Sequence, residues 1–126
     1  VGGHAGLFSN AEDLATLMQM ILNKGVYGGD RYLSAATINE FIKCQFCESD
    51  NRRGLGFDKP EMNYKKIGPT CKCVSALSFG HTGFTGTIAW VDPDKDLIYV
   101  FLSNRVYPDA ENKKINTLGV SRFSTR

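Results

Sequence analysis

The 126-residue chain has the composition of an ordinary globular domain, with 42% hydrophobic residues, 22% charged residues and a formal net charge of +2. This balance excludes a disordered chain and a coiled coil, and the length fits a single domain over residues 1–126. Lys and Arg form no long run, so we expect no nucleic-acid partner. The longest apolar stretch, Leu97–Leu102, is too short for a membrane span.

The first predicted element is a helix over residues 9–25. Ser9 and Glu12 have the spacing of a capping box, and Lys24 with Gly25 is typical of a helix end. Between them, apolar residues recur with the period of one helix face: Leu14, Leu17, Met18, Ile21 and Leu22. We expect this face to be buried. The glycine-rich residues around His4, before the helix, are interpreted as a tight structural loop.

A second helix is predicted over residues 35–44. The glycine-rich segment 26–34 precedes it and predicts a tight connection or a short hairpin. Ser34 can cap the helix, and its inward positions would then be Ile38, Phe41 and Ile42.

The remainder of the chain favours β structure. A short strand is predicted over residues 52–57, and a surface loop over residues 58–75. Strands follow from Leu77 to the triplet His81-Thr82-Gly83, over residues 87–92, and over residues 97–104 after a proline turn. The last strand is apolar on both faces, which predicts a central strand covered on both sides. A helical cue remains at residues 110–118. Together these elements indicate an α+β fold, with helices packed on an antiparallel sheet.

Four cysteines occur in two close pairs, Cys44 with Cys47 and Cys71 with Cys73. Unpaired thiols, one or two disulfides and a four-thiolate zinc site are all compatible with this spacing, and unpaired thiols are the leading expectation.

The order of these features resembles the C-terminal half of a serine β-lactamase-related hydrolase. The resemblance covers approximately residues 1–116 and is carried by "GHAGLFSNAEDLATLMQMILNKGVYGG", "RRGLGFD", "FGHTGFTGT", "WVDPDKDLIYVFLSNRVYP" and "ENKKIN". The closest branch is the group of class C β-lactamases, D-Ala-D-Ala carboxypeptidases and esterases. The resemblance implies an incomplete fold of the β-lactamase and transpeptidase type, a bacterial hydrolase, no cofactor and no catalytic metal.

The family carries three motifs, Ser-x-x-Lys, Tyr-x-Asn or Ser-x-Asn, and Lys-Thr-Gly, and His81-Thr82-Gly83 is similar to the third. The resemblance implies that His81 holds positive potential near a substrate carboxylate, which the Thr82 hydroxyl binds. Gly83 would let the substrate lie along the strand, and the backbone N–H of Phe84 would be one oxyanion donor. Asn104 resembles an Asn near the substrate carboxylate in class C enzymes. Capping of the strand end is the alternative role for Asn104.

Histidine at position 81 departs from the lysine of the usual motif. Lysine is charged at neutral pH, whereas imidazoles as a class titrate near pH ~6.5. We therefore expect weaker and pH-dependent binding of a carboxylate. This favours a peptidase or an esterase over an enzyme of drug resistance.

No Ser-x-x-Lys and no Tyr-x-Asn occurs in these 126 residues. Ser49-Asp50-Asn51 spells a second motif found in class A enzymes, but it stands in a charged loop and we interpret it as a coincidence. The expectation is therefore a C-terminal portion of a serine hydrolase that is inactive in isolation.

The predicted substrate is a small molecule or a peptidoglycan-like peptide: a D-alanyl peptide, an ester or a β-lactam. Two alternatives remain, a non-catalytic binding module with the same fold and a zinc-stabilised interaction domain. Faces left open by truncation predict self-association. The resemblance favours a periplasmic or other extracytoplasmic location.

Overall fold

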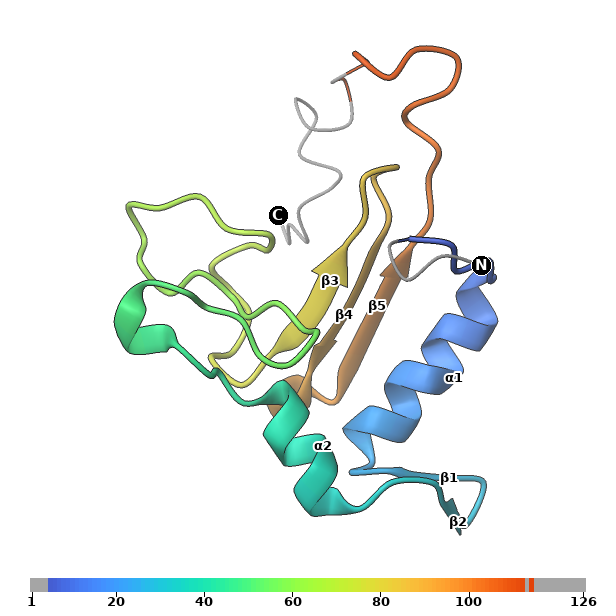
Figure 1. Cartoon of the computed structure of the whole chain (residues 1–126), viewed down its shortest axis with the longest axis vertical. Helices are drawn as coiled ribbons and strands as arrows, with labels where there is room; N and C mark the ends of the chain where they lie inside the picture. Colours follow the sequence, from blue (N-terminus) through green and yellow to red (C-terminus); the bar gives the residue numbers. More distant parts are fainter. Residues whose placement is uncertain (1–4, 113, 115–126) are drawn as a thin grey trace.

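The structure is a computed structural model of the chain, and it describes residues 5–112 and residue 114 (Figure 1). The loop expected at His4 lies outside the described residues, as does most of the helical cue at residues 110–118. Within the described part, two helices and two antiparallel sheets confirm the α+β class. No helix among the described residues is long and apolar enough to cross a membrane.

Helix α1 (Ala11–Leu22) begins two residues later than the sequence predicts. Its N-cap is Asn10, whose side chain accepts a hydrogen bond from the backbone N–H of Asp13 at 2.9 Å. The Ser9 hydroxyl instead contacts the carbonyl of Asn10. The predicted capping box at Ser9 is therefore wrong, because Asn at the next position accepts the same kind of bond from the first helical turn.

The connection after α1 is a hairpin of strands β1 (Val26–Tyr27) and β2 (Asp30–Arg31). Helix α2 (Ala35–Ile42) follows, and the Ser34 side chain caps it by accepting from the Thr37 N–H at 3.0 Å. Both features confirm the sequence prediction. Of the three expected inward residues, Ile38 is buried and Ile42 is half-buried, whereas Phe41 is exposed, so the inward position of Phe41 was wrong.

The main sheet has three antiparallel strands, β3 (Phe79–Thr82), β4 (Ile88–Asp92) and β5 (Leu97–Phe101), in the order β3-β4-β5. A short 3-10 turn, η2 (Pro93–Lys95), joins the last two. The central strand is β4. β5 lies at the edge of the described sheet with every residue half-buried, so the central position predicted for it was wrong. Its apolar sequence does not reveal which neighbours it has.

The helices cover one face of this sheet. The buried core joins Met18 and Ile21 of α1 and Ile38 of α2 to Phe79 and Val91 of the sheet. Figure 1 shows α1 running alongside the sheet next to β5, while α2 lies near its lower end. Because side chains alternate along a strand, Trp90 belongs to the opposite face.

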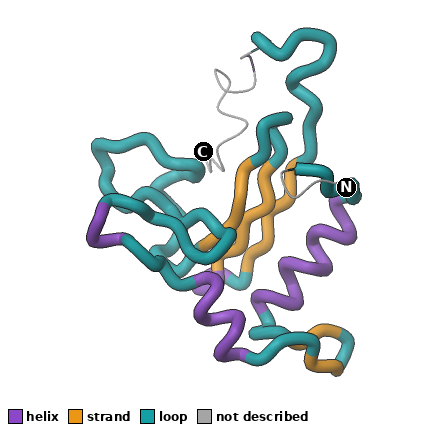
Figure 2. The backbone as a smooth tube through the Cα atoms, viewed as in Figure 1, coloured by secondary structure: helices purple, strands orange, loops and turns teal. Residues whose placement is uncertain are grey.

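Long loops occupy the side of the molecule beyond β3, drawn in teal in Figure 2. Residues 52–57 form no strand and make only an isolated bridge from Arg53 to Asp58. Asp58 forms a second isolated bridge, with Gly80 of β3. The predicted strand is therefore wrong, but the backbone of Asp58 ties this loop to the edge of the sheet.

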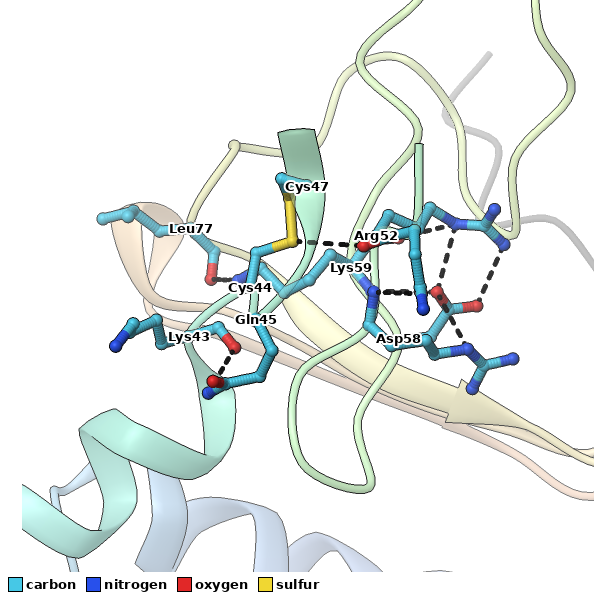
Figure 3. Close-up of a disulfide and its surroundings, with 10 residues drawn as sticks. Lys43, Cys44, Gln45, Cys47, Arg52, Asp58, Lys59 and Leu77 are labelled. Carbon is cyan, nitrogen blue, oxygen red and sulfur yellow. Dashed lines mark hydrogen bonds and ion pairs between the residues drawn. A yellow bond between two sulfur atoms is a disulfide. The ribbon is translucent and has the colours of Figure 1, made fainter. Parts of the chain in front are cut away.

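All four cysteines are paired, Cys44 with Cys47 and Cys71 with Cys73. Figure 3 shows the first disulfide beside α2 and the loop that contains Asp58. Unpaired thiols, the leading expectation from the sequence, were therefore wrong. The pairing also leaves no thiolate for the zinc site considered as an alternative.

Candidate functional site

The chain turns sharply where β3 meets β4. The Gly83 N–H donates to the Thr87 carbonyl at 2.8 Å, and the Gly86 N–H donates to the Gly83 carbonyl at 3.0 Å. Gly86 has a φ of 89°, which a residue with a side chain adopts only with strain. A Cβ at Gly83 would collide with the Thr87 hydroxyl. The positive φ of Gly86 thus favours glycine at this corner, and a side chain at Gly83 would require Thr87 to move.

The segment after β5 packs against the same corner. The Ser103 hydroxyl and the Arg105 N–H both donate to the Thr85 carbonyl, at 2.8 and 3.0 Å. The Arg105 guanidinium stacks over the Phe84 ring, with its carbon 4.9 Å from the ring centroid. These contacts hold the corner and the post-β5 segment together.

A cavity of about 510 Å³ opens beside this corner. It is lined by Arg52, Arg53, Asp58, Ile67, Gly68, Pro69, Thr82, Gly83, Phe84, Gly86, Thr87 and Arg105. Three of the five site residues expected from the sequence are among them: Thr82, Gly83 and Phe84. His81 and Asn104 do not line it.

His81 precedes Thr82 in β3, so the two side chains point to opposite faces of the strand. The His81 Nε2 atom lies 3.2 Å from an Arg53 guanidinium nitrogen, and its Nδ1 atom lies 2.7 Å from the Thr82 carbonyl oxygen. His81 is therefore connected to the cavity through Arg53, which does line it.

Asn104 is exposed, and its backbone carbonyl accepts from the Tyr107 N–H at 3.2 Å. Its side chain makes no hydrogen bond to another described residue. β5 ends at Phe101, three residues before it, which gives no support to a strand-capping role.

Four charged residues of the cavity wall are not among the site residues predicted from the sequence: Arg52, Arg53, Asp58 and Arg105. Figure 3 shows the Asp58 carboxylate beside the Arg52 guanidinium, whose two contacts are each 3.1 Å long. Arg53 Nε lies 3.8 Å from the same carboxylate. The available signal was the "RRGLGFD" stretch, where two adjacent arginines precede an aspartate.

The backbone of Asp58 explains how these residues reach the site. Its N–H donates to the Gly80 carbonyl at 2.7 Å, and the Gly80 N–H donates back to its carbonyl at 3.0 Å. A Cβ at Gly80 would collide with the Ala89 carbonyl and the Trp90 ring, so only glycine lets the strands lie this close. Asp58 is buried, with only 3% of the residue exposed.

The charge balance of the cavity is positive. Three arginines, Arg52, Arg53 and Arg105, line it together with one acidic residue, Asp58. Guanidinium groups bind carboxylates through paired hydrogen bonds, so the cavity suits an anionic group.

Lys59 lies next to Asp58 but is directed elsewhere. Its ammonium donates to the Leu77 carbonyl at 2.9 Å (Figure 3). It also lies 5.8 Å from the centroid of the Phe79 ring. Burial lowers the pKa of Lys59 to about 8, with a smaller contribution from the positive charge of Lys24. Lys59 therefore packs against the core residue Phe79 and does not line the cavity.

Ser49 lies at the end of a short 3-10 turn, η1 (Cys47–Ser49), and is exposed. Asp50 pairs with Lys66 at 2.6 Å, and this contact lowers the pKa of the Asp50 carboxyl. Neither Ser49 nor Asp50 lines the cavity. Residues 5–112 and 114 hold no group of three His, Cys, Asp or Glu side chains arranged to bind a metal ion.

Comparison with known proteins identifies the family of the chain. The family model described as beta-lactamase matches residues 1–121. A Salmonella paratyphi B protein named "Putative D-alanyl-D-alanine carboxypeptidase" is 36% identical over 116 residues, which are 92% of this chain and 26% of that protein. The chain thus spans about a quarter of the length of this relative.

Solved structures give the same result. A beta-lactamase from Mycobacterium bovis superposes with a TM-score of 0.64 at 28% identity, over 90% of this chain and 44% of that one. A Bacteroides dorei protein described as a "putative beta-lactamase" has a TM-score of 0.54 at 15% identity, over 94% of this chain and 43% of that one, and supports the fold alone. From the family match, the identity to its relatives and the shared fold, we conclude that the chain belongs to the beta-lactamase family.

Proposed function

We propose that this chain forms one wall of an acyl-transfer site, the wall built on the third motif at residues 81–83. The site would act on a D-alanyl peptide, an ester or a β-lactam. The observation that carries the proposal is the cavity of about 510 Å³, because Thr82, Gly83 and Phe84 line it together with three arginines. Family membership supports a serine hydrolase, and the positive cavity supports a substrate with an anionic end.

Each wall residue has a group available for substrate. The Thr82 hydroxyl makes no hydrogen bond to another described residue, and the backbone N–H of Phe84 likewise has no acceptor among residues 5–112 and 114. An N–H group that is fixed by a tight turn and left unpaired is suited to stabilise an oxyanion. The Phe84 ring is 74% exposed and offers an apolar surface at the cavity edge.

The nucleophile of the proposed site would come from residues other than these 126, which contain no Ser-x-x-Lys. Incubation of the chain with a penicillin or a fluorophosphonate should leave its intact mass unchanged. A stoichiometric adduct would place a nucleophile inside the chain, with Ser49 as the first residue to test.

The role of Thr82 can be tested by binding of N-acetyl-D-alanyl-D-alanine, measured by calorimetry. Thr82→Val should weaken binding about 10-fold, because a hydrogen bond to a charged group contributes about 1.5 kcal/mol or more. Thr85→Val is the matched control, since Thr85 does not line the cavity. Equal affinities of the two variants would contradict the assignment of Thr82.

We also propose that copies of this chain associate through the exposed side of α1. A second cavity, of about 440 Å³, lies beside α1 and is lined mainly by Leu17, Met20, Tyr27 and Tyr32, with Asp13 and Thr16. Leu17 is 46% exposed although it belongs to the apolar stripe of the helix. An apolar hollow of this kind tends to be covered by a partner, and a second copy supplies the same apolar chemistry.

An extracytoplasmic location is our proposal for the cell compartment. The two disulfides support it, because such bonds persist mainly in oxidising compartments.

A further inference from the structure

We infer that Arg53 is a positioning residue that holds His81 as a neutral imidazole with its proton on Nδ1, while Arg53 itself carries the positive charge at the cavity. This inference rests on the proposed function of the same site. In the usual third motif the charge belongs to the lysine of Lys-Thr-Gly, which here is histidine.

The protonation of His81 follows from what its neighbours can donate or accept. An arginine guanidinium has only donors, so the Nε2 atom 3.2 Å from Arg53 must accept a hydrogen bond. A backbone carbonyl has only acceptors, so the Nδ1 atom 2.7 Å from the Thr82 oxygen must carry a hydrogen. One proton on two ring nitrogens is the neutral ring. A second proton would place an N–H against a guanidinium cation.

Arg53 is held in place from two sides. Its backbone N–H donates to the Asn51 side-chain oxygen at 3.2 Å, and its backbone carbonyl accepts from the Gln45 N–H at 2.9 Å. These two bonds fix the backbone of Arg53. Its guanidinium lies between the Asp58 carboxylate, 3.8 Å from Nε, and the His81 ring. Asp58 is buried and bonded to β3, so the guanidinium is fixed relative to the strand that carries His81.

In this arrangement the positive charge at the cavity belongs to Arg53 and not to His81, the first residue of the third motif. Arg53 lines the cavity and His81 does not, so an anionic ligand meets a guanidinium rather than an imidazole. The charged groups around His81 and the cavity are Arg52, Arg53 and Asp58 from one loop and Arg105 after β5, while β4 places Ala89 opposite His81. None of the three guanidinium groups loses its charge near neutrality.

The consequence is opposite to the expectation drawn from the sequence. A histidine that carried the site's charge would make carboxylate binding fall as the pH rises through the imidazole range. With Arg53 as the cation, affinity for N-acetyl-D-alanyl-D-alanine should change less than about 2-fold between about pH 5.5 and about pH 8. A loss of about 10-fold over this range would overturn the inference.

The direct test is the tautomer of His81, measured without ligand by long-range ¹H–¹⁵N correlation on the ¹⁵N-labelled chain. The sequence contains two histidines, so His81→Gln assigns the signals. We expect Nδ1 protonated and Nε2 unprotonated at neutral pH. A ring protonated on Nε2, or on both nitrogens, would overturn the inference, and this result is independent of whether the dipeptide binds.

A pair of variants identifies the residue responsible. Arg53→Met should shift His81 toward a mixture of tautomers and weaken dipeptide binding about 10-fold. Arg105→Met is the control for the tautomer, because Arg105 lines the same cavity without contacting His81, and the Nδ1–H form should persist. Backbone amide spectra check that both variants fold. A tautomer unchanged in folded Arg53→Met would contradict the positioning role.

Discussion

Asp58 links the arginines of the cavity wall to the sheet. Its side chain contacts Arg52 and Arg53, and its backbone pairs with Gly80 of β3. A buried carboxylate is stable only when charged partners and hydrogen bonds replace its water, and here both arginines and the Lys59 N–H do so. The cavity wall therefore depends on the charge of one aspartate.

Asp58→Asn should lower the free energy of unfolding by about 2 kcal/mol, because it removes charge-assisted hydrogen bonds from a buried position. Urea unfolding measures the change. Asp94→Asn is the matched control, since Asp94 is exposed and makes no ion pair with another described residue, and its effect should stay under about 0.5 kcal/mol. Similar losses in both variants would show that the Asp58 network contributes little.

Lys59 predicts a pH dependence of stability. Burial lowers its pKa from 10.5 to about 8 in the folded chain, so between these values the unfolded chain binds more protons. Stability should therefore rise with pH from about pH 8 toward about pH 10, relative to a variant without this amine. Below about pH 8 both states are protonated and the difference should be constant.

Lys59→Met provides that reference, and unfolding is measured at several pH values. The stability of the wild-type chain relative to Lys59→Met should increase across the window. Lys65→Met, at an exposed lysine, controls for general charge effects and should give a flat difference. A flat difference for Lys59→Met as well would rule out the buried ammonium as the cause.

At the scale of elements, two neighbouring polar residues at the start of α1, Ser9 and Asn10, should differ in how much they stabilise the helix. Asn10→Ala should cost about 1 kcal/mol, because its side chain caps the helix by accepting from the Asp13 N–H. Ser9→Ala should cost less than about 0.5 kcal/mol, since Ser9 makes no bond to the first helical turn. Thermal or urea unfolding of the pair decides between them, and a larger loss from Ser9→Ala would restore the capping box.

The elements that the sequence predicted well are those with a local signal. The apolar period of α1, the serine before α2 and the glycines and proline around the hairpins each act within a few residues. The paired loop at Arg53 and Asp58 escaped prediction because its partner, Gly80, lies more than twenty positions away. The exposed position of Phe41 and the edge position of β5 also depend on neighbours that the local pattern does not contain.

The candidate site divides in the same way. The corner at Thr82, Gly83 and Phe84 could be predicted, because its glycines mark a turn within a few residues of one another. The arginines at positions 52, 53 and 105 reach the cavity from two separate segments, which no spacing in the sequence connects. Strand alternation places the side chains of His81 and Thr82 on opposite faces of the sheet, but this could be said only once the bounds of β3 were known.

At the scale of the whole molecule, the cavity beside α1 predicts that copies of the chain associate. The average mass from light scattering should rise with concentration, and Leu17→Lys should reduce the rise, because a charge there opposes burial of the apolar hollow. Leu55→Lys is the matched control, at an exposed leucine that lies in a loop and does not line this cavity. A chain that stays monomeric at high concentration would contradict the proposed contact.

The central claim is that the β3–β4 corner and its arginines form a substrate-binding wall. The most direct measurement is a titration of the ¹⁵N-labelled chain with N-acetyl-D-alanyl-D-alanine, followed by amide chemical shifts, with the L,L-dipeptide as control. The D,D-dipeptide should shift Thr82, Gly83, Phe84 and Arg53 most, and the L,L-dipeptide should shift them less. Equal shifts with both dipeptides, or shifts confined to residues outside the cavity, would contradict the account.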